Sequence, residues 1–240
     1  MISEGKSAVD KWAEEFLNGK VLLFNKPMYW TSYDLVNKIK AILKHSLGLK
    51  KIRIGHAGTL DPLASGLMLI CTGKETRNIE KYQSQPKAYE ARITLGATTP
   101  SYDLETEVSE KYPTDHIDRL AIIKTLASFK GIQNQKPPAY SARFKGGVRA
   151  YKLARRGEQV ELTPREVNIH SIELKSITMP VIEIRVLCSK GTYIRSLARD
   201  IGERLNSGAY LSGLVRTAIG DFLLEDALSI EEFQRNFIFL

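Results

Sequence analysis

A stiff turn between two apolar segments constrains the fold of this chain more than any other feature. Residues 55–66 read Gly-His-Ala-Gly-Thr-Leu-Asp-Pro-Leu-Ala-Ser-Gly. The glycines permit backbone angles that other residues avoid, and Pro62 fixes its own φ while steering Asp61 away from helical conformations. The turn follows a predicted strand at 51–54 and precedes 67–71, an unbroken apolar run typical of a strand buried on both faces. We therefore expect a rigid loop between core strands, with Asp61 inside it.

This pattern leaves two interpretations of Asp61 open. An Asp-Pro pair in a glycine-rich turn often has only a structural role, in which the carboxylate accepts hydrogen bonds from backbone N–H groups. A rigid loop between buried strands is also a place where a reactive carboxylate can be held in one position. Asp61 is therefore the first candidate for a catalytic residue, and other parts of the chain have to decide between the two roles.

Length and charge narrow the class of protein. The chain has 240 residues, 43% of them hydrophobic, so it can bury a sizeable core as a single domain. Its formal net charge of +8 favours an anionic partner, and nucleic acid is a better candidate than a membrane surface. Cys71 and Cys188 lie in apolar runs, as expected for buried thiols in a reducing compartment, and no Cys/His spacing indicates zinc. Without a signal peptide or a membrane-length apolar run, we expect a cytoplasmic protein.

Hydrophobic periodicity and capping residues predict the regular elements. We expect strands at 21–24, 87–96, 167–177 and 181–188, and helices at 10–18, after Thr31 or Ser32, at 74–82, from Thr114 to Gly131, and after a Thr192 cap. The helix after Thr31 has a basic face that continues into the following loop, with Lys38, Lys40, Lys44, His45, Lys50, Lys51 and Arg53. Such a face is usually only solvated, but it also suits contact with phosphates.

A second basic region, residues 136–165, begins with two prolines and contains Gly146 and Gly147. Two aromatic residues, Phe144 and Tyr151, lie among its cations, which are Arg143, Lys145, Arg149, Lys152, Arg155 and Arg156. Basic side chains on a hinged segment with aromatic residues between them suit a mobile clamp on an RNA backbone. A solvated surface loop is the alternative.

Five separated motifs between about residues 21 and 222 resemble the TruB family of tRNA pseudouridine synthases, in the order the family has them. The turn at 55–66 is similar to the catalytic motif of its bacterial members over twelve nearly continuous positions, which makes the resemblance specific. The other four are Asn-Lys-Pro with the residues that follow it, Lys-Ala-Tyr at 87–89, Lys-Gly-Thr-Tyr-Ile-Arg at 190–195, and 208–216. The basic region at 136–165 also resembles the family.

The resemblance implies an α+β fold, a mixed, mainly antiparallel sheet flanked by helices. It also implies conversion of uridine 55 in the T-loop of tRNA to pseudouridine, by base flipping and an essential Asp61, with no cofactor and no metal. Substrate contacts are implied at His56, Tyr89, Tyr193, Arg195 and Leu214, and RNA backbone contacts at Lys26, Arg143, Lys145 and Arg149. In this pattern the Tyr89 ring stacks on the target base and Arg195 pairs with Asp61. The His56 side chain fills the space that the base leaves.

The same resemblance predicts how the chain is organised. We expect residues 1–240 to form a single catalytic domain, with an N-terminal extension at 1–19, the basic RNA-clamp insertion at 136–165 and no C-terminal PUA domain. The expected partner is the T-stem-loop of tRNA, bound by a monomer without guide RNA or membrane. The sequence departs from the family pattern at Tyr29, Pro100, Phe144 and Val215.

Three other functions stay open at this stage. The first is a guide-RNA-dependent enzyme, as in the archaeal and eukaryotic relatives, against which the bacterial-like turn argues. The second is a tRNA-folding chaperone, whose role could accompany catalysis. The third is an unrelated aspartate hydrolase, which would need a second suitably placed carboxylate and would not account for the basic region.

Overall fold

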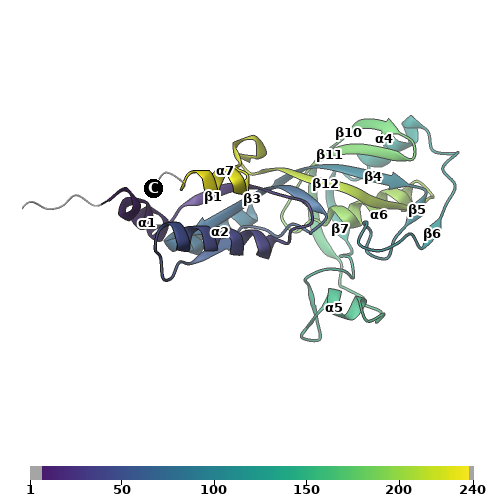
Figure 1. Cartoon of the computed structure of the whole chain (residues 1–240). Coiled ribbons are helices and arrows are strands. Elements are labelled where there is room, and N and C mark those ends of the chain that lie inside the picture. Colours follow the sequence, from purple (N-terminus) through teal and green to yellow (C-terminus); the bar gives the residue numbers. More distant parts are fainter. Residues whose placement is uncertain (1–6, 238–240) are drawn as a thin grey trace, which may run out of the picture. The chain divides into compact units, whose positions relative to one another are not determined.

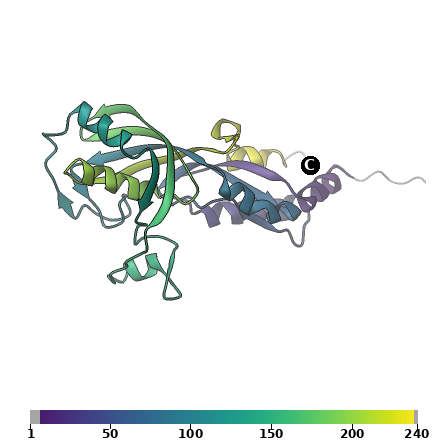
Figure 2. The ribbon, with the colours of Figure 1, turned by 180° about the vertical axis from the view of Figure 1, so that it is seen from behind.

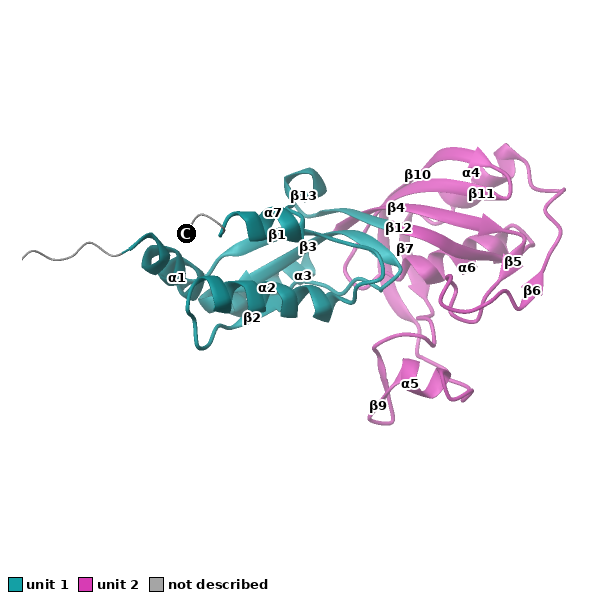
Figure 3. Ribbon diagram, in the orientation of Figure 1, with its two compact units in different colours: residues 1–85, 215–240 teal, residues 86–214 magenta. Residues whose placement is uncertain are grey.

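The computed structural model describes residues 7–237 and divides the chain into two compact units. Unit 1 consists of residues up to 85 and from 215 onward, and unit 2 of residues 86–214 (Figure 3). The strand β12 (Ala209–Ile219) supplies its residues 209–214 to unit 2 and 215–219 to unit 1. Each unit combines antiparallel strands with helices, as Figures 1 and 2 show from opposite sides, so the α+β fold expected from the sequence is confirmed.

Unit 1 is built around the strand β3 (Ala64–Thr72), which is buried from Gly66 to its end as the apolar run predicts. Its strand order is β1 (Val21–Lys26), β3 and β12, with β2 (Ile54–His56) also paired to β3 and β13 (Phe222–Leu223) to β12. Its helices are α1 (Ala8–Asn18), α2 (Ser32–Ser46), α3 (Ile79–Ser84) and α7 (Ile230–Arg235), with 3-10 turns η1 (Gly73–Asn78) and η2 (Leu224–Asp226).

Side chains from distant parts of the sequence close the core of unit 1. The Phe233 ring of α7 lies 5.1 Å from the Phe24 ring of β1 and 6.4 Å from the Phe16 ring of α1, measured between centroids. Helix α2 starts at a reciprocal cap in which the Thr31 side chain accepts from the Asp34 N–H and the Asp34 carboxylate accepts from the Thr31 N–H. Thr31 is thus one of the two caps expected from the sequence.

Unit 2 has the strand order β12, β4 (Lys87–Leu95), β11 (Val181–Cys188), β10 (Arg165–Thr178) and β7 (Gly131–Gln135). The alternation predicted for β11 is confirmed, because Ile182, Ile184, Val186 and Cys188 are all fully buried. The helices are α4 (Arg119–Ala127), α5 (Ala150–Ala154) and α6 (Ile194–Arg204), and the short strands are β5 (Ala97–Thr98), β6 (Glu110–Lys111), β8 (Phe144–Lys145) and β9 (Val148–Arg149). No helix within residues 7–237 is long and apolar enough to cross a membrane.

Three predicted boundaries are wrong, each for a local reason. The strand expected at 51–54 begins only at Ile54, because β3 ends at Thr72 and leaves residues 51–53 without a strand partner. Helix α4 begins after Asp118, whose carboxylate accepts from the Ala121 N–H at 2.7 Å, and not after Thr114. It also ends at Ala127, and Gly131 begins β7 instead.

The start of α6 also differs from the prediction. Thr192 does not cap this helix, because its hydroxyl donates to the Ser189 carbonyl at 2.9 Å in the preceding turn. Tyr193 occupies the cap position without a capping side chain. The beginning of α6 is therefore fixed by contacts from elsewhere in unit 2.

Gly66 and Gly48 provide a matched test of the packing in unit 1. Both have a positive φ, of 107° and 62°. A Cβ on Gly66 would lie 2.4 Å from the Arg216 carbonyl oxygen, whereas a Cβ on Gly48 would meet nothing within 4 Å. We expect Gly48→Ala to lower the free energy of unfolding by about 1 kcal/mol and Gly66→Ala by about 3 kcal/mol or more, measured by urea denaturation. Equal losses would contradict the close approach of β3 and β12.

Candidate active site

The Asp61 loop, residues 57–63, joins β2 to β3 and is held at several backbone positions. The Ser32 hydroxyl, at the start of α2, lies between two groups of Leu60, donating to its carbonyl at 3.1 Å and accepting from its N–H at 2.9 Å. The Tyr29 N–H donates to the Pro62 carbonyl at 2.7 Å, and the Ala64 N–H to the Asp61 carbonyl at 3.1 Å. The backbone on both sides of Asp61 is thus fixed, as the sequence predicts for a stiff turn.

The buried side chain of Arg216, in β12, donates hydrogen bonds to the backbone of this loop. Its side chain is 1% exposed, and its Nε donates to the Leu67 carbonyl at 2.7 Å. The two terminal nitrogens donate to the Gly58 carbonyl at 3.1 Å and the Thr59 carbonyl at 3.5 Å. One planar guanidinium therefore connects β3 to both residues at the beginning of the loop, a geometry that a lysine could not reproduce.

Lys26 is placed differently from the expectation. Its side chain is fully buried, and its ammonium donates to the Pro27 carbonyl at 2.8 Å and the Trp30 carbonyl at 2.7 Å. Burial lowers the pKa of Lys26 to about 8, while the negative charge of Asp61 acts in the opposite direction. A group with no exposed surface has no route to a phosphate, so this burial argues against the RNA backbone contact and for a role in holding the turn before α2.

His56 ends β2, opposite Ile70 of β3, and is half-buried. Burial, and then the charge of Arg216, lowers the pKa of the imidazole, so the ring is neutral at pH 7. A neutral ring beside the Asp61 loop suits packing against a base and does not supply a second charge there.

Arg195, at the second position of α6, is held within unit 2 by an acidic loop. It is 4% exposed, and its Nε lies 3.5 Å from an Asp103 carboxylate oxygen. Its Nη1 donates to the Ser101 carbonyl at 3.3 Å. The Asp103 carboxylate also accepts from the Glu105 N–H at 3.0 Å, which fixes the orientation of that side chain. The structure thus gives Arg195 a buried anionic partner in Asp103, and its pairing with Asp61 stays a prediction.

Gln135 fixes the position of Tyr193. This glutamine is 4% exposed at the end of β7. Its amide nitrogen donates to the Tyr193 carbonyl at 3.1 Å, and its amide oxygen accepts from the Tyr193 N–H at 2.8 Å. The two bonds fix the backbone of Tyr193, the residue directly before α6. The other two predicted substrate residues of unit 2 are Tyr89 in β4, which is 8% exposed, and Leu214 in β12, which is half-buried.

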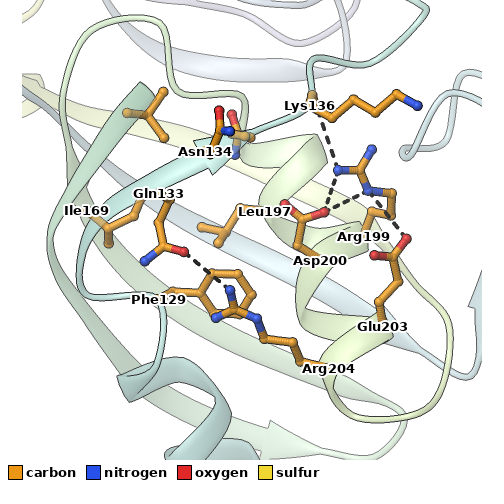
Figure 4. Close-up of a pocket in the computed structure, with 12 residues that line it drawn as sticks. Phe129, Gln133, Asn134, Lys136, Ile169, Leu197, Arg199, Asp200, Glu203 and Arg204 are labelled. Atoms are coloured by element: carbon orange, nitrogen blue, oxygen red, sulfur yellow. Dashed lines mark hydrogen bonds and ion pairs between the residues drawn. The ribbon is translucent and has the colours of Figure 1, made fainter. Parts of the chain in front are cut away.

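Charged side chains on the outer face of α6 surround a pocket of about 220 Å³ (Figure 4). The Arg199 guanidinium binds the Asp200 carboxylate, with Nε at 2.8 Å, and lies 3.6 Å from Glu203. Arg204 stacks at 3.7 Å from the centroid of the Phe129 ring. Burial raises the pKa of Asp200, and the Arg199 charge opposes that shift. None of the predicted catalytic, substrate-binding or RNA-backbone residues lines this pocket, and Arg199 is paired with Asp200 and Glu203, so the pocket anchors α6 and is not the candidate site.

The basic region at 136–165 projects from the rest of unit 2, with α5 near its tip (Figures 1 and 2). Its base is attached to α6, because the Lys136 carbonyl accepts from the Ser196 hydroxyl at 2.8 Å. Strands β8 and β9 form a hairpin through Gly146 and Gly147, which both have positive φ as a tight hairpin turn requires. The residues around this turn are exposed, including Arg143, Lys145 and Arg149.

Comparison with known proteins identifies the family. Residues 44–194 match the TruB family pseudouridylate synthase (N terminal domain). A tRNA pseudouridine synthase B of Phocaeicola vulgatus is 56% identical over 91% of this chain and 93% of its own length. A protein of the same name from Flavobacterium johnsoniae is 52% identical over 93% of this chain and 98% of its own length. The chain belongs to the TruB family.

Solved structures agree with this assignment. The TruB-family chain described above superposes on a chain of a Cbf5-Nop10-Gar1 complex with a TM-score of 0.71 and 26% identity over 98% of its length. A chain of an H/ACA RNP bound to a substrate RNA containing 2′-deoxyuridine gives a TM-score of 0.68 and 27% identity over 93% of its length. Our chain spans only 58% and 55% of those two chains.

The structure explains two departures from the TruB family pattern. Tyr29, where the family usually has glycine, adopts a φ of 68° while its side chain is 75% exposed, so the backbone can still reach Pro62. Phe144, where a lysine is usual, carries the Arg149 guanidinium 4.0 Å above its ring centroid. The Phe144 ring therefore orients the Arg149 cation, whereas a lysine at position 144 would itself carry the charge.

Sequence reasoning missed four residues that hold the candidate site. Ser32, Asp103, Gln135 and Arg216 touch predicted site residues or their loop through contacts that join segments far apart in the chain. A usable signal existed for Ser32 and Arg216, which lie in the first and last TruB-like motifs, and for Asp103, which lies in the segment that departs from the family pattern at Pro100. Among residues 7–237, no cluster of three or more His, Cys, Asp or Glu side chains is placed to hold a metal ion.

Replacing Arg216 by lysine should loosen the Asp61 loop without unfolding unit 1. An ammonium cannot donate to the Leu67, Gly58 and Thr59 carbonyls together, and each lost hydrogen bond to a charged donor is worth about 1.5–3 kcal/mol. We expect hydrogen–deuterium exchange of residues 57–63 to accelerate at least about tenfold. Peptides from unit 2 should be unchanged, as should the loop in an Arg235→Lys control, since Arg235 is exposed on α7. Unchanged loop exchange in Arg216→Lys would contradict the positioning role.

Proposed function

We propose that this protein converts uridine to pseudouridine in tRNA, at position 55 of the T-loop, with the Asp61 carboxylate as its catalytic group. The observation that carries the proposal is the Asp61 loop, in which hydrogen bonds to Leu60, Pro62, Gly58 and Thr59 fix the backbone on both sides of the carboxylate. Membership of the TruB family and relatives named tRNA pseudouridine synthase B support the reaction and its substrate.

The chemistry needs few groups. The bond from C1′ to N1 of uracil breaks, the base turns while it is held, and a bond from C1′ to C5 forms. The hydrogen on C5 is released to solvent and N1 takes up a proton, so atoms balance without an oxidant or reductant. A carboxylate can serve as nucleophile or as base in such a sequence, and a dry pocket keeps the detached base from escaping. No cofactor or metal enters any of these steps.

The remaining predicted site residues have roles that suit their environments. A target base has to leave its stack, which costs about a few kcal/mol, and stacking on an aromatic ring offsets much of that cost. Tyr89 is the ring we assign to this contact, with Tyr193 and Leu214 as pocket walls. His56, neutral at pH 7, takes the vacated space. Arg195 is the cation that we assign to the Asp61 carboxylate.

We further propose that the protein acts without guide RNA, as a monomer in the cytoplasm, and holds the RNA backbone with the exposed cations Arg143, Lys145 and Arg149. Relatives that carry the name tRNA pseudouridine synthase B are 52–56% identical to this chain, whereas the chains from the H/ACA and Cbf5 complexes are 26–27% identical. That difference supports a stand-alone enzyme. The outward projection of the hairpin from unit 2 supports its use as a clamp.

Tritium release tests the proposal directly. A T-stem-loop hairpin carrying 5-tritiated uridine should lose tritium to water when treated with the parent protein, since C5 gives up its hydrogen. We expect Asp61→Asn to abolish release while hairpin affinity stays within about threefold, because the amide keeps the shape of the side chain but cannot act as nucleophile or base. Asp221→Asn, a control at an exposed aspartate of unit 1, should release tritium like the parent. Release by Asp61→Asn at the parental rate would refute the catalytic assignment.

A further inference from the structure

Unit 1 contains a basic groove of about 660 Å³ that the proposed catalytic site does not use. Its walls come from α2, which supplies Lys40 and Lys44, and from the loop after it, which supplies Lys50, Lys51 and Arg53. The 3-10 turn η1 adds Lys74 and Arg77. These seven exposed cations, together with the Leu17, Ile52 and Gly73 surfaces between them, define the basic groove.

The cations of the basic groove lack anionic partners. No acidic residue lines the groove, and within residues 7–237 none of the seven cations takes part in an ion pair. Among the described residues, the one side-chain hydrogen bond of these cations is donated by the Lys74 ammonium to the Asn18 side-chain oxygen, at 3.0 Å. Lys40 and Lys44 are four residues apart on one helical face, where like charges repel. A surface of this kind is destabilised until an anion with several charges neutralises it.

The backbone beneath these cations is fixed. The Gly73 N–H donates to the Arg53 carbonyl at 2.9 Å, which ties η1 to the loop. Gly73 has a φ of 50°, and a Cβ there would lie 2.1 Å from the Leu17 carbonyl oxygen, so the end of α1 packs directly on η1. Ile52 is 7% exposed and anchors the loop in the core. The groove is therefore a formed surface and not a set of lysines on a loose loop.

The basic groove lies far from Asp61 along the same strand. Arg53 precedes β2, and Ile54 pairs with Thr72 at the C-terminal end of β3. The Asp61 loop enters β3 at the opposite end, at Ala64. Eight residue steps separate Ala64 from Thr72, which at about 3.3 Å per residue amounts to about 26 Å. A nucleotide held at Asp61 cannot also occupy the groove, so its occupant is another part of a long ligand.

We propose that the basic groove binds the sugar-phosphate backbone of tRNA outside the T-stem-loop, at the end of β3 opposite to the Asp61 loop. A phosphodiester backbone supplies a row of charges that a free phosphate or a single acidic side chain cannot, and neutralising it releases counterions. This inference rests on the proposed function, because tRNA is the polyanion that the enzyme would already hold at Asp61. If the groove binds in this way, whole tRNA should bind more tightly than the isolated hairpin.

A charge-reversal pair tests the groove against an equal change in net charge elsewhere. Lys40→Glu/Lys44→Glu alters two groove cations on α2. Lys124→Glu/Lys175→Glu alters two exposed lysines of α4 and β10, in unit 2, that do not line the groove. Dissociation constants are measured for a full-length tRNA transcript and for the T-stem-loop hairpin at several salt concentrations. Tritium release from the hairpin is followed in parallel for both variants and the parent protein.

We expect the groove variant to bind full-length tRNA at least about tenfold more weakly, with a log–log salt slope smaller by about two. Its hairpin affinity and hairpin turnover should stay within about twofold of the parent, and the control variant should lose little with either RNA. Unchanged tRNA binding, an equal loss for the hairpin, or an equal loss in the control would overturn the inference. These outcomes are separate from those that test the proposed function, which fails if the parent releases no tritium from the hairpin or if Asp61→Asn releases it at the parental rate.

Discussion

The Arg216 guanidinium holds together the part of the structure on which the candidate chemistry depends. It is buried between β3 and the Asp61 loop and donates to carbonyls of both. A buried charge without partners would cost several kcal/mol, so the loop carbonyls have to face the guanidinium whenever unit 1 is folded. The packing of Arg216 in unit 1 therefore also positions the Asp61 backbone. Ser32 and Tyr29 complete the arrangement from the other side, at Leu60 and Pro62.

Local rules predicted the elements whose causes are local. The buried strand β3 follows from an unbroken apolar run, and the start of α2 follows from Thr31 and Asp34, three residues apart. Residues 51–53 look like a strand but have none to pair with, because β3 ends at Thr72. No local pattern contains that information. The start of α6 was predicted wrongly for a similar reason, since the residue before it, Tyr193, is held by Gln135, about sixty residues earlier in the chain.

In the candidate site too, the sequence predicted some residues, whereas contacts between distant segments could not be predicted. Resemblance to a family marked Asp61, Tyr193 and Arg195, but the residues that hold the Asp61 loop, Tyr193 and Arg195 come from distant segments and carry no periodic signal. Asp103 beside Arg195 is an example, because the sequence only showed a departure from the pattern at Pro100 nearby. At Lys26 the family resemblance implied an RNA backbone contact, whereas its burial and its two carbonyl partners support a structural role. The charge of a residue does not show whether its side chain contacts a ligand or is buried and stabilises the backbone.

The proposed enzyme isomerises a single nucleotide of tRNA, and mapping the modified position tests this claim most directly. An unmodified tRNA transcript would be treated with the protein, and pseudouridine located by carbodiimide labelling and primer extension. A rigid carboxylate loop that acts on a flipped T-loop base predicts a single new stop, at uridine 55, that appears without guide RNA. No stop, or stops at other uridines with none at position 55, would contradict the central claim.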